Sequence, residues 1–220
     1  MKLSSSSLKL KLLVGFVFVS ASMWKPCYGE AMDSIKAYIK EQNIDKSNKY
    51  WRIKLPKFPE TTFEEGKTYH WELKTNKGKI VVEFMPKVAP NHVANFIYLT
   101  ELGFFDGLSF HRVISGFMAQ GGCPQGNGRG GPGYKFAGEY DPNVKHDTPG
   151  LLSMANAGPG TDGSQFFLTF VETAWLDGKH TIFGKITDGM DTLKALEASG
   201  SRSGTPSEPL SIETAKITVH

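Results

Sequence analysis

Glycine and proline divide this chain into short segments. The sequence has 24 glycines and 12 prolines in 220 residues, which leaves little room for long helices. Residues 69–73 and 79–84 alternate in polarity or run apolar, and Thr-Asn-Lys-Gly lies between them at residues 75–78. Two such runs joined by a short turn predict a β-hairpin. Strands linked by tight loops are therefore favoured over a helical bundle.

After residue 68, two stretches have helical periodicity. The first begins at Pro90, carries Val93, Phe96 and Ile97 on one face, and stops at Gly103. The second is expected at residues 190–198, and the chain ends on a strand at residues 216–219. Many strands with two amphipathic helices fit a mainly β fold, a closed antiparallel barrel whose ends the helices cap. The pattern alone leaves a β-sandwich as an alternative.

Residues 1–31 have the layout of a signal peptide. A basic start precedes an apolar run at residues 12–19, and small residues follow, with Gly29-Glu-Ala31 as a candidate cleavage site. A transmembrane helix needs about 20 apolar residues, so we expect no stable membrane span. We expect export to the periplasm or the exterior. An uncleaved membrane anchor and a cytoplasmic location are the alternatives.

Residues 32–67 form a charged, lysine-rich extension. A short helix is expected at residues 34–42, where Ile35, Tyr38 and Ile39 have helical spacing. About 35 residues of this composition cannot supply a core of their own, so we interpret them as an extension rather than a second domain. The folded domain is expected at residues 68–220. The sequence leaves open whether the extension packs on that domain or binds a partner.

The charge distribution gives no reason to expect a nucleic-acid partner. The formal net charge is +3, and residues 1–31 account for all of it, so the remaining residues are neutral overall. No basic stripe is visible in that remainder. Only Cys27 and Cys123 are present, which excludes a disulfide framework. We expect Cys123 to be buried.

Three apparent motifs are rejected by their context. Residues 126–131 match the dinucleotide pattern G-x-G-x-x-G, but prolines on both sides leave no helix to receive a pyrophosphate. Ser164 lacks the strand-to-helix elbow of an acyl-transfer serine. Five residues could be imagined as metal ligands, but no pair has a zinc-site spacing, so we expect no metal. They are His111, His146, His180, Cys123 and Asp162.

Residues 110–122 place one cation among apolar side chains. They read Phe-His-Arg-Val-Ile-Ser-Gly-Phe-Met-Ala-Gln-Gly-Gly, with Arg112 in an alternating run that Gly116 ends. Phe117, Met118 and Gln120 follow, so a guanidinium, a ring, a thioether and an amide are expected to meet on one surface. Taken alone, the pattern fits a surface arginine beside core residues equally well.

Two further stretches decide between these interpretations. Residues 152–170 read Leu-Ser-Met-Ala-Asn-Ala-Gly-Pro-Gly-Thr-Asp-Gly-Ser-Gln-Phe-Phe-Leu-Thr-Phe, and residues 175–185 read Trp-Leu-Asp-Gly-Lys-His-Thr-Ile-Phe-Gly-Lys. Together and in this order, the three stretches resemble the cyclophilin family of peptidyl-prolyl cis-trans isomerases, and the resemblance covers residues 68–220. It implies an eight-stranded antiparallel barrel capped by two α-helices, with the ligand groove on its outside.

The resemblance implies an enzyme that rotates X-Pro peptide bonds and assists protein folding. Its partners would be proline-containing polypeptides, a cyclosporin-like compound would inhibit it, and the reaction would need no cofactor. We expect exported proteins as clients and a monomeric chain. The alternative function is that of a proline-peptide binding chaperone whose isomerase activity is incidental.

The resemblance also implies which residues form the site. Arg112 is expected to stabilise the twisted amide and Gln120 to orient the guanidinium. The residues expected in catalysis are Arg112, Gln120, Asn156 and His180. Those expected to bind the substrate are Phe117, Met118, Ala155, Ala157, Gln165, Phe167, Trp175 and Leu176. One departure is Cys123, which stands where the family more often has aspartate, and it bears on the loop rather than on the chemistry.

Overall fold

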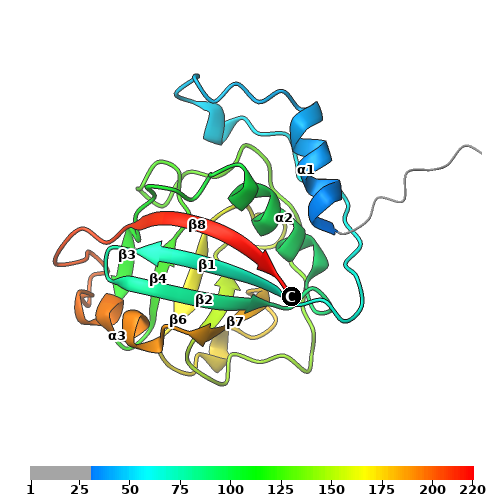
Figure 1. Ribbon diagram of the computed structural model, residues 1–220. Coiled ribbons are helices and arrows are strands. Elements are labelled where there is room, and N and C mark those ends of the chain that lie inside the picture. Colours follow the sequence, from blue (N-terminus) through cyan, green and yellow to red (C-terminus); the bar gives the residue numbers. More distant parts are fainter. Residues whose placement is uncertain (1–30) are drawn as a thin grey trace, which may run out of the picture.

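The computed structural model describes residues 31–220 (Figure 1), so all of the expected signal peptide except Ala31 lies outside the described residues. The described chain forms three α-helices and eight strands, with two short 3₁₀ helices. The helices are α1 (Ala31–Glu41), α2 (Pro90–Glu101), α3 (Met190–Ala198), η1 (Trp51–Ile53) and η2 (Ala174–Leu176). The strands are β1 (Tyr69–Thr75), β2 (Gly78–Phe84), β3 (Arg112–Ile114), β4 (Met118–Gly121), β5 (Leu151–Met154), β6 (Phe166–Thr169), β7 (Ile182–Asp188) and β8 (Ile212–Val219).

The eight strands form one curled antiparallel sheet in the order β3-β4-β6-β5-β7-β2-β1-β8. Its two edges are joined through the residues that precede β3 and β8. The Gly107 N–H donates to the Ile212 carbonyl at 2.8 Å, and the Phe110 N–H donates to the Leu210 carbonyl at 3.0 Å. These bonds satisfy backbone groups that an open edge would expose. The expectation of a mainly β, eight-stranded antiparallel fold is confirmed, as is the β1–β2 hairpin.

Aromatic rings fill the space inside the sheet. Trp71 of β1 is fully buried, and its ring centroid lies 5.0 Å from the centroids of both Phe105 and Phe166. Phe96 of α2 contacts the same indole at 5.2 Å, with the two rings nearly perpendicular. Edge-to-face pairs of this kind add stability beyond their buried area. Helix α2 is therefore part of the core as well as its cover.

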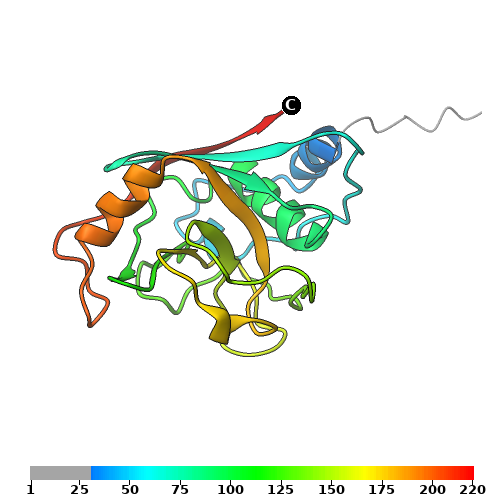
Figure 2. The same ribbon diagram turned by 90° about the horizontal axis from the view of Figure 1, so that it is seen from below.

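The two helices predicted within the domain are confirmed. Pro90 opens α2, where its missing N–H leaves no bond unmade, and Gly103 follows the helix in a left-handed conformation with φ of +66°. Helix α3 spans the predicted residues and buries Leu193 and Leu196. Figures 1 and 2 place α2 and α3 at opposite ends of the sheet, so each end of the core is covered. Among the described residues, no helix has the length and apolar character needed to cross a bilayer.

The extension packs on the domain, a question that the sequence left open. The predicted helix is confirmed, although it already includes Ala31. Helix α1 lies against α2, with Ile35 fully buried and the Tyr38 ring 6.0 Å from the Tyr98 ring. After the helix, the Arg52 guanidinium donates to three carbonyl groups in the turn that follows α2. The first part of the extension is therefore anchored by both apolar and polar contacts.

The second part of the extension reaches the glycine-rich loop at residues 126–133. The Leu55 N–H donates to the Pro132 carbonyl at 2.9 Å. Phe58 is buried against Tyr134 and Phe136, with ring centroids 5.9 and 5.0 Å away. The extension thus belongs to the same folded unit as the barrel.

We expect Phe58→Ala to lower the free energy of unfolding by about 3–5 kcal/mol, because it empties a site enclosed by two aromatic rings. Urea denaturation followed by circular dichroism measures this loss. Tyr50→Ala is the matched control: Tyr50 lies in the same extension but is 48% exposed, so its loss is expected to stay within about 0.5 kcal/mol. Equal stability of both variants and the wild type would show that the extension does not dock.

Candidate active site

One row of side chains crosses four neighbouring strands on the outside of the sheet. In the strand register, Arg112 of β3 faces Gln120 of β4, Gln120 faces Phe167 of β6, and Phe167 faces Ser153 of β5. Directly paired residues point to the same side of a sheet. A cation, an amide, an aromatic ring and a hydroxyl therefore lie in line.

The other face of the same strands belongs to the core. Val113, Ala119, Leu168 and Leu152 form the adjacent row, and all four are fully buried in the hydrophobic core. Because side chains alternate along a strand, the residues between them point outward.

The outward row borders a hollow of about 160 Å³. Its lining combines one guanidinium, two amides and an imidazole with apolar side chains, so it suits a ligand that is partly apolar and partly polar. The lining residues are Arg112, Phe117, Met118, Gln120, Ala155, Asn156, Phe167, Leu176 and His180. All nine were predicted from the sequence, and the structure brings them together from five separate parts of the chain.

A chain of polar contacts fixes one edge of the hollow. The Arg112 Nη1 donates to Gln120 Oε1 at 3.3 Å, and Gln120 Nε2 donates to Gln165 Oε1 at 3.0 Å. Gln165 Nε2 then donates to the carbonyls of Gly128 and Gly130, each at 2.8 Å. The guanidinium is thereby oriented through two amides that the glycine-rich loop holds in place.

A distant loop supports the aliphatic part of Arg112. The Val113 N–H donates to the Gly204 carbonyl at 2.8 Å, which holds that loop beside β3. Gly204 has φ of +90°, and a Cβ atom there would lie 2.9 Å from the Arg112 Cγ. Only glycine meets both conditions without strain. No local pattern predicts this contact, because Arg112 and Gly204 are 92 positions apart in the sequence.

The apolar floor consists of Met118 and Phe167, which are 2% and 4% exposed. Both are buried, yet neither belongs to the core cluster, since they lie on the outward face. Phe117 is half-buried beside them. His180 stands edge-on to Phe167, with centroids 5.5 Å apart, and its Nδ1 donates to the Met154 carbonyl at 2.8 Å. The apolar floor is therefore bordered by Phe117 on one side and by the hydrogen-bonded His180 ring on another.

A second histidine supports Phe167 from behind. The His146 ring stacks on Phe167 at an interplanar angle of 12°. Its Nδ1 lies 2.9 Å from Asp177 Oδ1, and its Nε2 lies 2.9 Å from Ser153 Oγ. Burial lowers the pKa of His146 although Asp177 opposes the shift, so the ring is neutral at pH 7. His146 is thus a structural hydrogen-bonding residue that holds the Phe167 ring in place.

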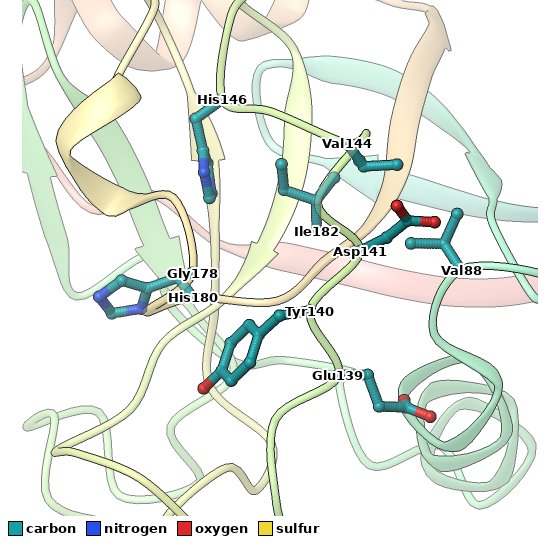
Figure 3. Close-up of a pocket in the computed structure, with 9 residues that line it drawn as sticks. All are labelled: Val88, Glu139, Tyr140, Asp141, Val144, His146, Gly178, His180 and Ile182. Atoms are coloured by element: carbon teal, nitrogen blue, oxygen red, sulfur yellow. The ribbon is translucent and has the colours of Figure 1, made fainter.

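Figure 3 shows the small pocket between these two histidines and the loop at residues 139–144. The His180 ring points away from it, and Val144 and Ile182 are among the residues that line it. Its volume of about 10 Å³ leaves room for roughly one water molecule. We therefore assign it no ligand.

A larger hollow of about 370 Å³ continues from the first. The two share Gln120, Ala155 and Asn156, and the predicted Ala157 and Gln165 line only the second. The Asn156 side chain donates to the Lys179 carbonyl at 3.0 Å. Within residues 31–220, the backbone N–H and C=O of Asn156 have no hydrogen-bond partner. These groups are placed to pair with an extended peptide.

Trp175 is the one predicted site residue that lines neither hollow. It is 60% exposed, and its ring lies 5.9 Å from that of Phe117, so it stands beside the first hollow. Conversely, sequence reasoning missed several residues of the second hollow, which come from loops without periodicity. They are Arg129, Pro132, Tyr134, Lys135 and Thr161.

The rejected motifs have other roles. No helix follows the glycines at residues 126–131, and Ser164 is buried with its hydroxyl donating to the Gly122 carbonyl. Cys123 is buried as predicted. His111 lines neither hollow, and burial together with the Arg112 charge lowers its pKa. Within the part of the chain that the structure describes, no cluster of metal-ligating residues is found.

A buried charged cluster joins α2 to the loops beside the second hollow. His92 Nδ1 lies 2.6 Å from Glu139 Oε2, and its Nε2 lies 2.9 Å from Asp162 Oδ2. Burial alone would lower the pKa of His92, but hydrogen bonds to Asp162 and Glu139 outweigh it and raise that pKa above 6.5. Removing the partner of a buried charge is costly, so this cluster fixes the position of the loop containing Asp162.

The described geometry agrees with comparisons with known proteins. A family model described as cyclophilin type peptidyl-prolyl cis-trans isomerase/CLD matches residues 70–217. The chain is 49% identical over 164 residues to peptidyl-prolyl cis-trans isomerase B of Streptomyces anulatus, a match that covers 66% of this chain and 94% of that protein. It is 51% identical over 136 residues to a peptidyl-prolyl cis-trans isomerase of Helicobacter pylori, covering 61% and 83%.

Solved structures give the same result. The crystal structure of a Cryptosporidium parvum cyclophilin type peptidyl-prolyl cis-trans isomerase aligns with a TM-score of 0.66 at 36% identity, covering 69% of this chain and 98% of that one. A second structure of that protein, in the presence of the dipeptide Ala-Pro, aligns with a TM-score of 0.65 at 37% identity, covering 68% and 98%.

We expect His92→Gln to lower the free energy of unfolding by about 3–5 kcal/mol, because it leaves the buried Asp162 and the half-buried Glu139 carboxylates without their cation. The folded-state pKa of His92 is raised, so its contribution is complete below pH 6.5 and is lost as the pH rises through the raised value. The difference in free energy of unfolding between the wild type and the variant is therefore expected to become smaller above pH 6.5. Urea titrations at several pH values measure it, with the exposed His220→Gln as control. Parallel pH profiles for wild type and H92Q would contradict the assignment.

Proposed function

This chain belongs to the cyclophilin family of peptidyl-prolyl cis-trans isomerases, and we propose that Arg112 and the hollow beside it turn X-Pro bonds in exported proteins. The observation that carries the site assignment is the juxtaposition of an oriented guanidinium and a shaped apolar floor on the outer face of β3, β4 and β6.

The catalysed reaction crosses a barrier without making or breaking a covalent bond. Rotation about an amide costs about 18–20 kcal/mol, and for X-Pro bonds cis and trans are close in energy but interconvert in tens to hundreds of seconds. No nucleophile or redox group is needed for such a step. The enzyme must only stabilise the twisted amide more than the planar one.

Arg112 is proposed to provide that preference. As the bond twists, the prolyl nitrogen loses conjugation and its lone pair becomes a hydrogen-bond acceptor. A guanidinium carries its charge at every relevant pH and presents several donors in one plane. Roughly 1.4 kcal/mol of preferential stabilisation gives a tenfold rate increase. The contact with Gln120 supports this role, since it holds the guanidinium at the edge of the hollow through one of its nitrogens.

The apolar floor is proposed to hold the proline ring while the other side of the amide turns. Phe117 and Leu176 line the hollow beside the floor residues Met118 and Phe167, and His180 closes one edge. Burial of Met118 and Phe167 supports this role, because fixed walls confine the ring better than mobile ones.

The second hollow is proposed to receive the residues that precede the proline. The free backbone groups of Asn156 support an extended peptide there, flanked by Ala155 and Ala157, with Gln165 as a polar contact. The Cryptosporidium parvum relative was crystallised in the presence of Ala-Pro, which supports a proline-containing peptide as ligand. We also propose that a cyclosporin-like compound inhibits the enzyme, with the exposed Trp175 as one contact.

Export is proposed from the first 31 residues, whose basic start and apolar run are typical of a signal peptide. The family match begins only at residue 70, so these residues lie outside the domain shared with the relatives.

We expect Arg112→Ala to lower kcat/KM for a proline tetrapeptide by about 100-fold, comparable to the loss of one transition-state hydrogen-bond donor. Arg112→Lys is expected to recover little, since it keeps the charge but not the planar fork. The exposed Arg202→Ala removes the same group elsewhere and is expected to match the wild type. An unchanged kcat/KM in folded R112A protein would remove Arg112 from the mechanism.

If the chain is exported, cell fractionation should find it outside the cytoplasm with a new amino terminus close to Ala31. Edman sequencing of the purified native protein measures that terminus. A cytoplasmic protein that retains Met1 would contradict export and leave the isomerase assignment unaffected.

A further inference from the structure

The extension carries a concentration of positive charge that the rest of the domain balances. Residues 46–57 contain four lysines and one arginine and no acidic residue. Because residues 32–220 are neutral overall, the residues outside this segment carry a net charge of −5. The sequence-based statement that no basic stripe is present was therefore wrong: opposite charges cancel in the total while remaining apart in the structure.

The positive charges lie around two aromatic rings. Lys49 Nζ lies 4.8 Å and Lys54 Nζ 6.0 Å from the centroid of Tyr50, and Lys46 Nζ lies 5.7 Å from that of Trp51. We call these five residues the basic tip. Its three lysines are exposed, and none of them forms an ion pair within residues 31–220. Figure 1 shows the segment beside α1, standing out from the barrel.

The basic tip is anchored to the turn that follows α2. Arg52 Nε donates to the Phe104 carbonyl and its Nη2 to the Asp106 carbonyl, both at 2.9 Å, and the Trp51 ring packs edge-on against Phe104. The only guanidinium in the segment is thus used for anchoring. What remains for a ligand is a set of ammonium groups around a tyrosine that is 48% exposed.

We infer that the basic tip docks this enzyme on an anionic lipid surface. Tyrosine, tryptophan and lysine are the side chains that favour the interface of a bilayer, where rings lie among headgroups and ammonium groups meet phosphates. A protruding tip fits a flat surface. The negative charge of the remaining residues is repelled by the same surface, so attraction and repulsion together orient the molecule with its tip toward the lipid.

Single-stranded nucleic acid fits the tip less well. Its bases bind by stacking on open aromatic faces. Here ammonium groups lie over the Tyr50 ring, and Trp51 is covered by Lys46 and by the Arg52 guanidinium at 4.9 Å. No residue of the tip lines either hollow of the active site, so the tip is separate from the proposed peptide site.

The test compares two variants of the full chain that lose the same charge. Lys46→Gln/Lys49→Gln/Lys54→Gln neutralises the basic tip, and Lys87→Gln/Lys185→Gln/Lys194→Gln neutralises three exposed lysines elsewhere. Co-sedimentation is measured with vesicles of phosphatidylcholine alone and with 30% phosphatidylglycerol, each at 0.05 and 0.5 M salt. Because residues 1–31 can bind both vesicle types, the quantity compared is the increase in vesicle binding when phosphatidylglycerol is added.

We expect the tip variant to lose about 100-fold in partitioning to the anionic vesicles, roughly fivefold for each lysine. The control variant should keep the wild-type increase in vesicle binding, and 0.5 M salt should abolish that increase. The kcat/KM on a proline tetrapeptide should be unchanged in both variants. Equal gains in the two variants would overturn the inference. So would a tip variant that loses binding to a single-stranded 20-mer oligonucleotide while keeping its vesicle binding.

Discussion

Four short strands, β3, β4, β6 and β5, must serve the core and the active site at once. Alternation along each strand assigns one row of side chains to the interior and the next row to the outer surface. Val113, Ala119 and Leu168 therefore fill the barrel while Arg112, Gln120 and Phe167 line the first hollow. A register shift of one residue in any of these strands would turn its outward side chains toward the core and its core side chains outward. The geometry of the site is thus fixed by the same pairing that closes the sheet.

Support from outside the four strands determines how well the outward row is positioned. Gln165 connects the amide that orients the guanidinium to the carbonyls of the glycine-rich loop. Gly204 packs against the aliphatic part of the Arg112 side chain. The His146 imidazole stacks on the Phe167 ring and holds that ring in place. These contacts are polar or close-packed and come from loops. The side chains that line the first hollow therefore depend on loops that contribute little to the hydrophobic core.

Local signals in the sequence were enough to predict the β1–β2 hairpin, α2, α3 and the apolar stripe of α1, because each depends on neighbouring residues. Resemblance to the family supplied the nine residues of the first hollow, since its motifs are continuous stretches. The second hollow and the support from Gly204 were missed because they join loops that have no periodicity. The docking of Phe58 was missed because burial depends on three-dimensional proximity. The basic tip lies in one continuous segment and was missed for another reason, because its charge is cancelled in the net charge of residues 32–220.

The outer position of the active site bears on how long polypeptides can reach it. A binding cavity inside a barrel would admit a chain only by its end, and the core rings around Trp71 leave no such passage here. A cleft on the surface accepts a segment sideways, so an internal proline can be engaged while both flanking portions of the polypeptide continue past the enzyme. Prolines far from either terminus, including those in a chain still attached to the machinery that makes or moves it, are then as accessible as those near an end.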